Sequence, residues 1–188
     1  MSHSALLVID VQSSFFHRDY WCEDHFPAFK EAVSQLIAGC EARSVPVINV
    51  LHADGDGPFD LASGLVTPMP FLHHVPDVTF YKRVHNALTE SGLQHWLQQQ
   101  NITQLIVCGI RTEQCCETTA RVAADLGYQV IFVTEATLTF PMTHNGITLS
   151  VADLFHRTET VLNGRFATIH TVDSCLQALS SSLARRSG

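Results

Sequence analysis

The sequence predicts an α/β protein in which helices cover both faces of a mostly parallel sheet of about six strands. Short apolar runs rich in β-branched residues alternate with longer segments of helical period, the pattern of a doubly wound, three-layer fold. The chain has 188 residues, of which 46% are hydrophobic, so it can bury one core of ordinary size. No linker, internal repeat or low-complexity segment divides it, and we expect a single domain over residues 1–188.

The apolar runs are the expected strands, and the segments between them are the expected helices. We expect strands at residues 5–11, 46–52, 78–82, 104–110, 129–136 and 167–171. We expect helices at residues 27–42, 88–100, 113–126, 150–162 and 173–183. Residues 54–76 are rich in glycine and proline and show no period, which predicts a long loop near the site or against another subunit.

Charge and composition exclude several classes of partner. The net charge is -7 and no basic stripe is present, so we expect no nucleic-acid partner. The first apolar run ends at Asp10, too early for a signal or membrane segment, so we expect a cytoplasmic protein with no membrane contact. Six cysteines form no C-x-x-C pair, which predicts free thiols.

Three reactive side chains stand at or just after the ends of predicted strands. Asp10 follows the first run, Lys82 ends the third, and Cys115 comes shortly after the fourth. Because the carboxyl ends of parallel strands meet at one edge of a sheet, we expect the three in one pocket. Thr112 is a candidate N-cap, which would place Cys115 in a first helical turn, where the helix dipole lowers a thiol pKa.

Each of these residues also has a structural interpretation. A strand-end aspartate can cap or form a structural ion pair, a single lysine is commonly solvated, and most cysteines in helices are inert. Cys116 is interpreted as core, because it shares a helical stripe with Ala120, Ala123 and Gly127.

The order of these residues resembles a known family. Asp10-Val11-Gln12 followed by Phe15 is similar to the D-x-Q-x-x-F opening of the isochorismatase-like hydrolases, which include nicotinamidases and N-carbamoylsarcosine amidases. Gly109-Ile110-Arg111-Thr112, with Cys115 and then Thr119-Ala120, resembles the family's G-[IV]-x-T-x-x-C-V-x-x-T-A segment, except that Cys116 replaces the valine. The resemblance extends over nearly the whole chain and implies the isochorismatase-like hydrolase fold.

The resemblance also implies roles for individual residues. Asp10 would be the base, Lys82 its electrostatic partner and Cys115 the nucleophile. A cis peptide bond is implied between Ile110 and Arg111, and the backbone N–H groups of Arg111 and Cys115 would form an oxyanion hole. The family likeness further implies a homodimer or homotetramer.

Three further residues are candidates for the wall of a substrate pocket. They are Phe15, Gln12 and Phe140. The aromatic members could equally be core, and we regard a flat small-molecule substrate as suited to such walls.

No metal and no cofactor is expected. Eleven histidines are present, but no H-E-x-x-H or other tight ligand spacing occurs. The D-x-H metal motif of nicotinamidases has no counterpart, because the second strand ends in His52-Ala53-Asp54. A glycine-rich dinucleotide motif and a Walker motif are also absent from the sequence.

These observations predict a cysteine hydrolase that cleaves a C–N bond of a small amide, ureido or carbamoyl compound through a thioester. One alternative is an isochorismatase-type vinyl-ether hydrolase, although the resemblance implies that those enzymes do not rely on the cysteine. Another alternative is a non-catalytic or redox-sensing protein that retains the three residues.

Overall fold

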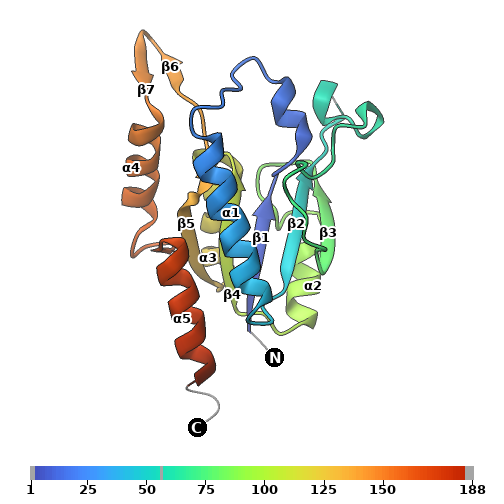
Figure 1. The fold of residues 1–188 in the computed structure, drawn as a ribbon, viewed down its shortest axis with the longest axis vertical. Coiled ribbons are helices and arrows are strands. Elements are labelled where there is room, and N and C mark those ends of the chain that lie inside the picture. The colour runs from blue at the N-terminus through green and yellow to red at the C-terminus, as the bar shows by residue number, and fades with distance from the viewer. Residues whose placement is uncertain (1–2, 56, 185–188) are drawn as a thin grey trace.

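A six-stranded parallel sheet forms the centre of the molecule in the computed structural model, which describes residues 3–55 and 57–184 (Figure 1). The strands are β1 (Ser4–Ile9), β2 (Val47–His52), β3 (Val78–Lys82), β4 (Gln104–Ile110), β5 (Gln129–Leu138) and β8 (Thr168–Ile169). Their order is β3-β2-β1-β4-β5-β8, and every pairing is parallel. The predicted α/β fold class is confirmed.

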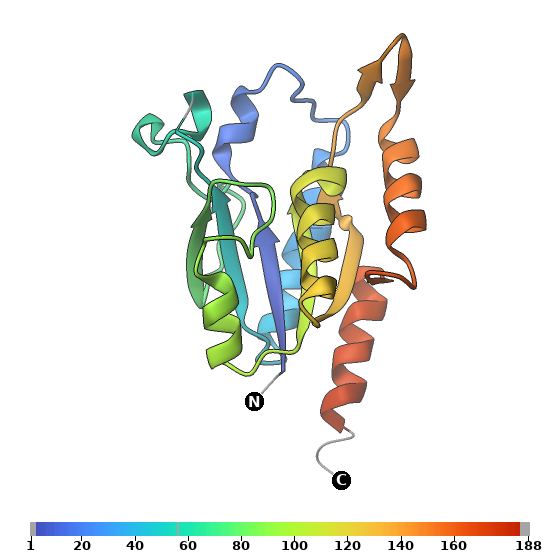
Figure 2. The ribbon, with the colours of Figure 1, turned by 180° about the vertical axis from the view of Figure 1, so that it is seen from behind.

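Helices cover both faces of this sheet. The helices are α1 (Phe26–Glu41), α2 (Leu93–Gln99), α3 (Glu117–Asp125), α4 (Val151–Leu162) and α5 (Val172–Ala184). Figure 1 shows α1 and α5 in front of the sheet, and Figure 2 shows α2 and α3 on the opposite face. No helix among the described residues is long and apolar enough to cross a bilayer.

Alternate residues of β1 pack into two separate cores, one on each face of the sheet, and this produces the three layers of helices, sheet and helices. Leu6 and Val8 pack with residues of α1 and α5, whereas Leu7 and Ile9 pack with residues of α2 and α3. Since successive strand side chains point to opposite faces, a strand buried on both sides is apolar throughout. The run Ala5 to Ile9 is therefore apolar without alternation.

Several element boundaries differ from those expected. The helix expected at 88–100 begins only at Leu93, because Gly92 before it has a left-handed backbone with a φ of 85°. The helix expected at 113–126 is divided into a π-helical turn, Thr112–Cys116, and α3. The sixth strand, expected at 167–171, is reduced to the two residues of β8.

A short hairpin was not expected from the sequence. It joins β6 (Met142–His144) to β7 (Ile147–Leu149) and extends beyond the sheet beside α4 (Figures 1 and 2). Its turn residues Asn145 and Gly146 both have positive φ, which is the backbone of the Asn-Gly hairpin turn. That dipeptide was the available sequence signal.

The site is positioned by a close approach of β4 to β1. Gly109 pairs with Ile9, and a Cβ atom at Gly109 would lie 2.0 Å from the Ile9 carbonyl oxygen. Only glycine fits this contact, and it holds the end of β4 beside Asp10, the residue that follows β1.

Candidate active site

The three strand-end residues meet at the carboxyl edge of the sheet. Lys82 Nζ lies 2.8 Å from Asp10 Oδ2 and donates a hydrogen bond of 3.3 Å to Cys115 Sγ. Asp10 and Lys82 are each 1% exposed, and Cys115 is 7% exposed. The structure therefore brings Asp10, Lys82 and Cys115 together in one buried cluster.

Each side chain is placed by the end of a different strand. Asp10 has a left-handed backbone with a φ of 53°, which turns the chain sharply after β1. Lys82 is the last residue of β3, which is separated from β1 by β2, so its side chain reaches across the end of β2. Cys115 lies in the π-helical turn after β4, and the peptide bond between Ile110 and Arg111 is cis.

His52 is a fourth member of the cluster that sequence reasoning did not include. Its Nδ1 atom lies 2.8 Å from Lys82 Nζ. An ammonium group only donates, so Nδ1 is the acceptor and the ring proton is on Nε2, 3.6 Å from Asp54 Oδ2. The available signal was its position, because His52 ends β2, the strand between those that carry Asp10 and Lys82.

His85 approaches the nucleophile from the loop after β3. Its Nδ1 atom lies 3.6 Å from Cys115 Sγ. The rings of His52 and His85 have centroids 6.4 Å apart, so two imidazoles flank the cluster. No motif in the sequence marked His85.

Charges in the cluster determine where the protons lie. Burial alone would lower the pKa of Lys82, but Asp10 and Cys115 raise it above its ordinary value, so the ammonium stays charged. Burial and the Lys82 ammonium lower the pKa of His52, which keeps this imidazole neutral and able to accept.

The expectation that Cys115 is a thiolate is wrong for the protein without substrate. Burial and the Asp10 carboxylate raise the pKa of the Cys115 thiol, and together they outweigh Lys82, which lowers it. Thr112 is not the N-cap either, because the π-helical turn begins at Thr112 itself with Arg111 as its cap, and the Thr112 hydroxyl donates to Thr137 Oγ1 at 2.7 Å. The cysteine therefore holds its proton until a base removes it, and Asp10 is beside it.

A small cavity of about 120 Å³ opens onto this cluster. Its lining residues are Asp10, Phe15, Arg18, Tyr20, His52, Asp54, Phe59, His85, Gln114 and Cys115. Phe15, an expected wall residue, lies on it. The cavity is well below the 300–1,000 Å³ of a drug-sized site, so it suits a small ligand group.

The other two expected wall residues do not lie on this cavity. Gln12 is fully buried, where its side chain accepts from the His52 N–H at 2.7 Å and donates to the His52 carbonyl at 3.0 Å. It therefore holds the end of β2 against β1. Phe140 packs behind the cavity, with its ring 5.1 Å from that of Tyr20.

Arg111, an expected oxyanion-hole residue, has a buried side chain that anchors the turn before Cys115. Its guanidinium donates to the Phe140 carbonyl at 3.1 Å and lies 3.2 Å from Glu113 Oε1. Its guanidinium is thus held by Phe140 and Glu113, and the role implied for its backbone N–H stays a prediction.

Three potential metal ligands converge here, but a cation already lies among them. Ligand atoms of Asp10, His52 and Cys115 lie within 4.8 Å of one another. The Lys82 ammonium contacts all three, at 2.8, 2.8 and 3.3 Å. A metal ion bound by these atoms would have to displace that ammonium, at the cost of burying two cations together.

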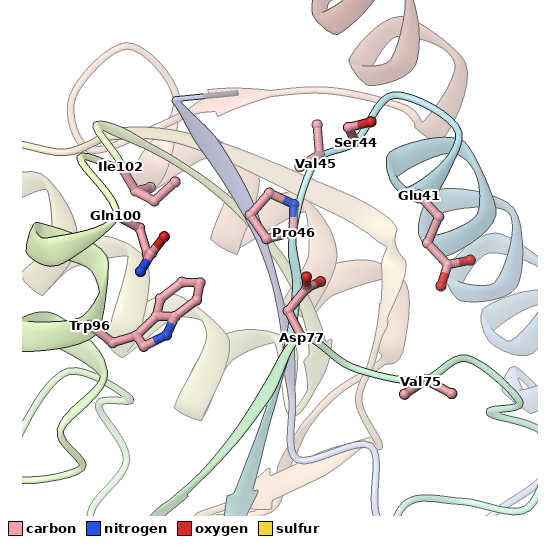
Figure 3. Close-up of a pocket in the computed structure, with 9 residues that line it drawn as sticks. All are labelled: Glu41, Ser44, Val45, Pro46, Val75, Asp77, Trp96, Gln100 and Ile102. Atoms are coloured by element: carbon pink, nitrogen blue, oxygen red, sulfur yellow. The ribbon is translucent and has the colours of Figure 1, made fainter. Parts of the chain in front are cut away.

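A larger hollow lies at the opposite end of the sheet (Figure 3). It has a volume of about 570 Å³ and is lined by Glu41, Ser44, Val45, Pro46, Val75, Asp77, Trp96, Gln100 and Ile102. The Asp77 carboxylate accepts from the Val47 N–H at 2.8 Å, which is a structural role at the start of β2. The lining of the larger hollow holds no thiol and no lysine, so we assign the chemistry to the smaller one.

A doubly wound parallel sheet with reactive groups at the carboxyl ends of its strands is the arrangement of an α/β enzyme. The family model for the isochorismatase domain matches residues 4–164. The chain therefore belongs to the isochorismatase family of hydrolases.

Individual relatives agree with this assignment. The chain is 26% identical over 182 residues to the uncharacterized isochorismatase family protein YrdC of Bacillus subtilis (strain 168), covering 92% of this chain and 94% of YrdC. It is 31% identical over 153 residues to Nicotinamidase 3 of Arabidopsis thaliana, covering 73% and 74% of the two chains. A crystal structure of a cysteine hydrolase from Pseudomonas syringae pv. phaseolicola 1448A has a TM-score of 0.81 at 23% identity and covers 95% of this chain and 93% of that chain.

Proposed function

We propose that the protein hydrolyses a C–N bond of a small amide, ureido or carbamoyl compound through a thioester at Cys115. The observation that carries the proposal is the contact of one buried ammonium, Lys82, with both a carboxylate and a thiol. The similarity to Nicotinamidase 3, whose name denotes an amide hydrolase, supports the same bond type.

The first half of the reaction forms the acyl-enzyme. Asp10 takes the proton of the Cys115 thiol as sulfur attacks the carbonyl carbon, and Lys82 stabilises the sulfur as it becomes negative. The resulting oxyanion would accept hydrogen bonds from the backbone N–H groups of Arg111 and Cys115. The C–N bond then breaks, and Asp10 gives its proton to the leaving nitrogen.

The second half releases the acid. A water molecule loses a proton to Asp10 and attacks the thioester carbon, after which the C–S bond breaks and the proton returns to sulfur. The raised pKa of Cys115 agrees with this order, because a thiol that is protonated at rest requires a base.

The test measures ammonia release from a panel of small amides, ureido compounds and carbamoyl compounds. Cys115→Ala is expected to abolish release and to lose the acyl-enzyme mass adduct that the proposal predicts for the wild type. Cys116→Ala is the matched control, because the neighbouring thiol is fully buried in the core and should be dispensable. Full turnover by Cys115→Ala would refute the proposal.

Two other outcomes identify the alternatives. Pyruvate release from a vinyl-ether substrate, without ammonia, would indicate an isochorismatase-type reaction. No product with any compound, together with reversible oxidation of Cys115, would indicate a redox-sensing protein.

A further inference from the structure

Arg18 is a charged residue on the cavity wall that the proposed chemistry does not use. It lies directly after the 3-10 helix Ser13–His17 and is exposed to solvent. Among the described residues, no carboxylate forms an ion pair with its guanidinium, and no side-chain hydrogen bond joins it to the protein.

Two carboxylates also line this wall. Asp10 is paired with Lys82, and the Asp54 carboxylate faces the His52 ring. Neither carboxylate forms an ion pair with Arg18 in the described part of the chain, so its guanidinium is available to an anionic ligand.

An aromatic ring holds this guanidinium in place. Arg18 Cζ lies 4.6 Å from the centroid of the Phe59 ring. Phe59 in turn packs edge-on against Phe15, at 5.2 Å, and against His52, at 5.7 Å. Because His52 also contacts Lys82, one continuous set of contacts joins Arg18 to the reacting groups.

Stacking on a ring leaves the edge of a guanidinium available. Its N–H groups lie in the plane and form a fork that matches the two oxygens of a carboxylate. The ring contact also limits the rotamers of Arg18, so less side-chain freedom is lost when a ligand binds.

We propose that Arg18 binds a carboxylate of the substrate, and hence that the substrate is a small amide that carries a carboxylate group. This inference rests on the proposed function for the position of the scissile bond. The cavity of about 120 Å³ places the carboxylate only a few atoms from the carbon that Cys115 attacks.

Alkylation of Cys115 tests this without a known substrate. Iodoacetate and iodoacetamide carry the same reactive carbon, but only iodoacetate has a carboxylate. The ratio of their rates at Cys115, measured by peptide mass spectrometry, reports the preference of the cavity for an anion.

Arg18→Gln is expected to lower the iodoacetate-to-iodoacetamide ratio roughly fivefold or more, as the loss of a charge-assisted hydrogen bond implies. Arg83→Gln is the matched control, because Arg83 is equally an exposed arginine but does not line the cavity. An unchanged ratio in Arg18→Gln would overturn the proposal. An equal fall in Arg83→Gln would also overturn it, because it would show a general effect of surface charge.

Hydrolysis kinetics separate the two proposals. Where the panel identifies a carboxylate-bearing substrate, Arg18→Gln should raise KM for it more than for its neutral ester. A panel with no hydrolysis but with an Arg18-dependent alkylation ratio would reject the proposed function and keep the anion site. Hydrolysis with an alkylation ratio and a KM that Arg18→Gln leaves unchanged would reject the anion site and keep the proposed function.

Discussion

The Lys82 ammonium has three N–H groups and three acceptors. Asp10, His52 and Cys115 each lie within hydrogen-bonding distance of it. The Asp10 carboxylate balances the charge of the ammonium, the His52 imidazole accepts a second hydrogen bond and orients it, and the Cys115 thiol accepts the third. At the residue scale, the reactivity of the Cys115 sulfur therefore depends on the contacts that the Lys82 ammonium also makes with Asp10 and His52.

Removal of the imidazole acceptor should impair the chemistry more than the fold. In His52→Leu, a buried ammonium loses an acceptor, which costs about 1.5–3 kcal/mol and predicts a fall in kcat of roughly tenfold to a hundredfold. His74→Leu is the control, because His74 is also partly buried and bonds to Asn49, away from this cavity. Steady-state kinetics and the melting temperature measure both effects, and an equal loss of kcat in both variants would contradict the assignment.

The raised pKa of Cys115 predicts slow alkylation near neutral pH. The rate with iodoacetamide should keep rising above pH 8.5, about where an ordinary thiol is half ionised, instead of reaching a plateau below it. Site-resolved mass spectrometry over a pH series measures this, with N-acetylcysteine as the reference thiol. A plateau below pH 8 would show that the resting cysteine is a thiolate after all.

At the scale of elements, the site depends on how closely β4 approaches β1. Gly109 has a φ of 127° and faces the backbone of Ile9. Backbone atoms cannot move aside as a flexible side chain can, so the contact admits no Cβ. The turn that carries Cys115 begins three residues later, at Thr112, and its cap is Arg111.

Gly109→Ala should therefore destabilise the fold strongly. The new Cβ would meet the Ile9 carbonyl, and we expect the free energy of unfolding to fall by roughly 3 kcal/mol or more. Gly127→Ala is the matched control, because Gly127 also has a positive φ but nothing within 4 Å of its Cβ position, so only about 1 kcal/mol of backbone strain applies. Urea denaturation compares them. Equal losses of unfolding free energy in the two variants would contradict the conclusion that the contact of Gly109 with Ile9 excludes a Cβ atom.

At the scale of the whole molecule, buried titratable groups define a pH range of stability. Burial first of all lowers the pKa of both His52 and His74 from 6.5. Burial raises the pKa of Cys40 from 9.0 to about 12 and that of Cys175 to about 11. In the native state these histidines are thus harder to protonate, and these cysteines harder to deprotonate, than in the unfolded chain.

Stability should consequently fall on both sides of this range. Below about pH 6.5 the unfolded chain binds more protons than the native state, since its histidines protonate first, so stability decreases as the pH falls. Above about pH 8.5 the unfolded chain loses thiol protons that the native state keeps, so stability decreases as the pH rises. Each group contributes at most about 1.4 kcal/mol per pH unit.

Urea denaturation midpoints across this pH range, under reducing conditions, check the prediction. The double variant His52→Gln, His74→Gln should flatten the acid side and leave the alkaline side unchanged. A flat acid side in the wild type would contradict the lowered histidine pKa values.

The self-association that the family likeness implies also belongs to this scale. A homodimer or homotetramer stays a prediction, which light scattering after size exclusion would measure.

The sequence alone determined the fold class, all six strands of the main sheet to within two residues at each end, and the grouping of Asp10, Lys82 and Cys115. These follow from local apolar runs and from the rule that parallel strands end at one edge, so no knowledge of distances was required. The buried position of Cys116 was also evident from its helical spacing and is confirmed.

Only the tertiary structure decided how the strand-end residues interact. The bond from Lys82 to His52, the role of Gln12 in holding β2, and the protonated state of Cys115 all depend on contacts between segments distant in the chain. The place of Cys115 in a first helical turn is a local property, whereas the burial and the Asp10 carboxylate that raise its pKa come from other segments. Desolvation and charge proximity are three-dimensional quantities, and they determine where the protons lie.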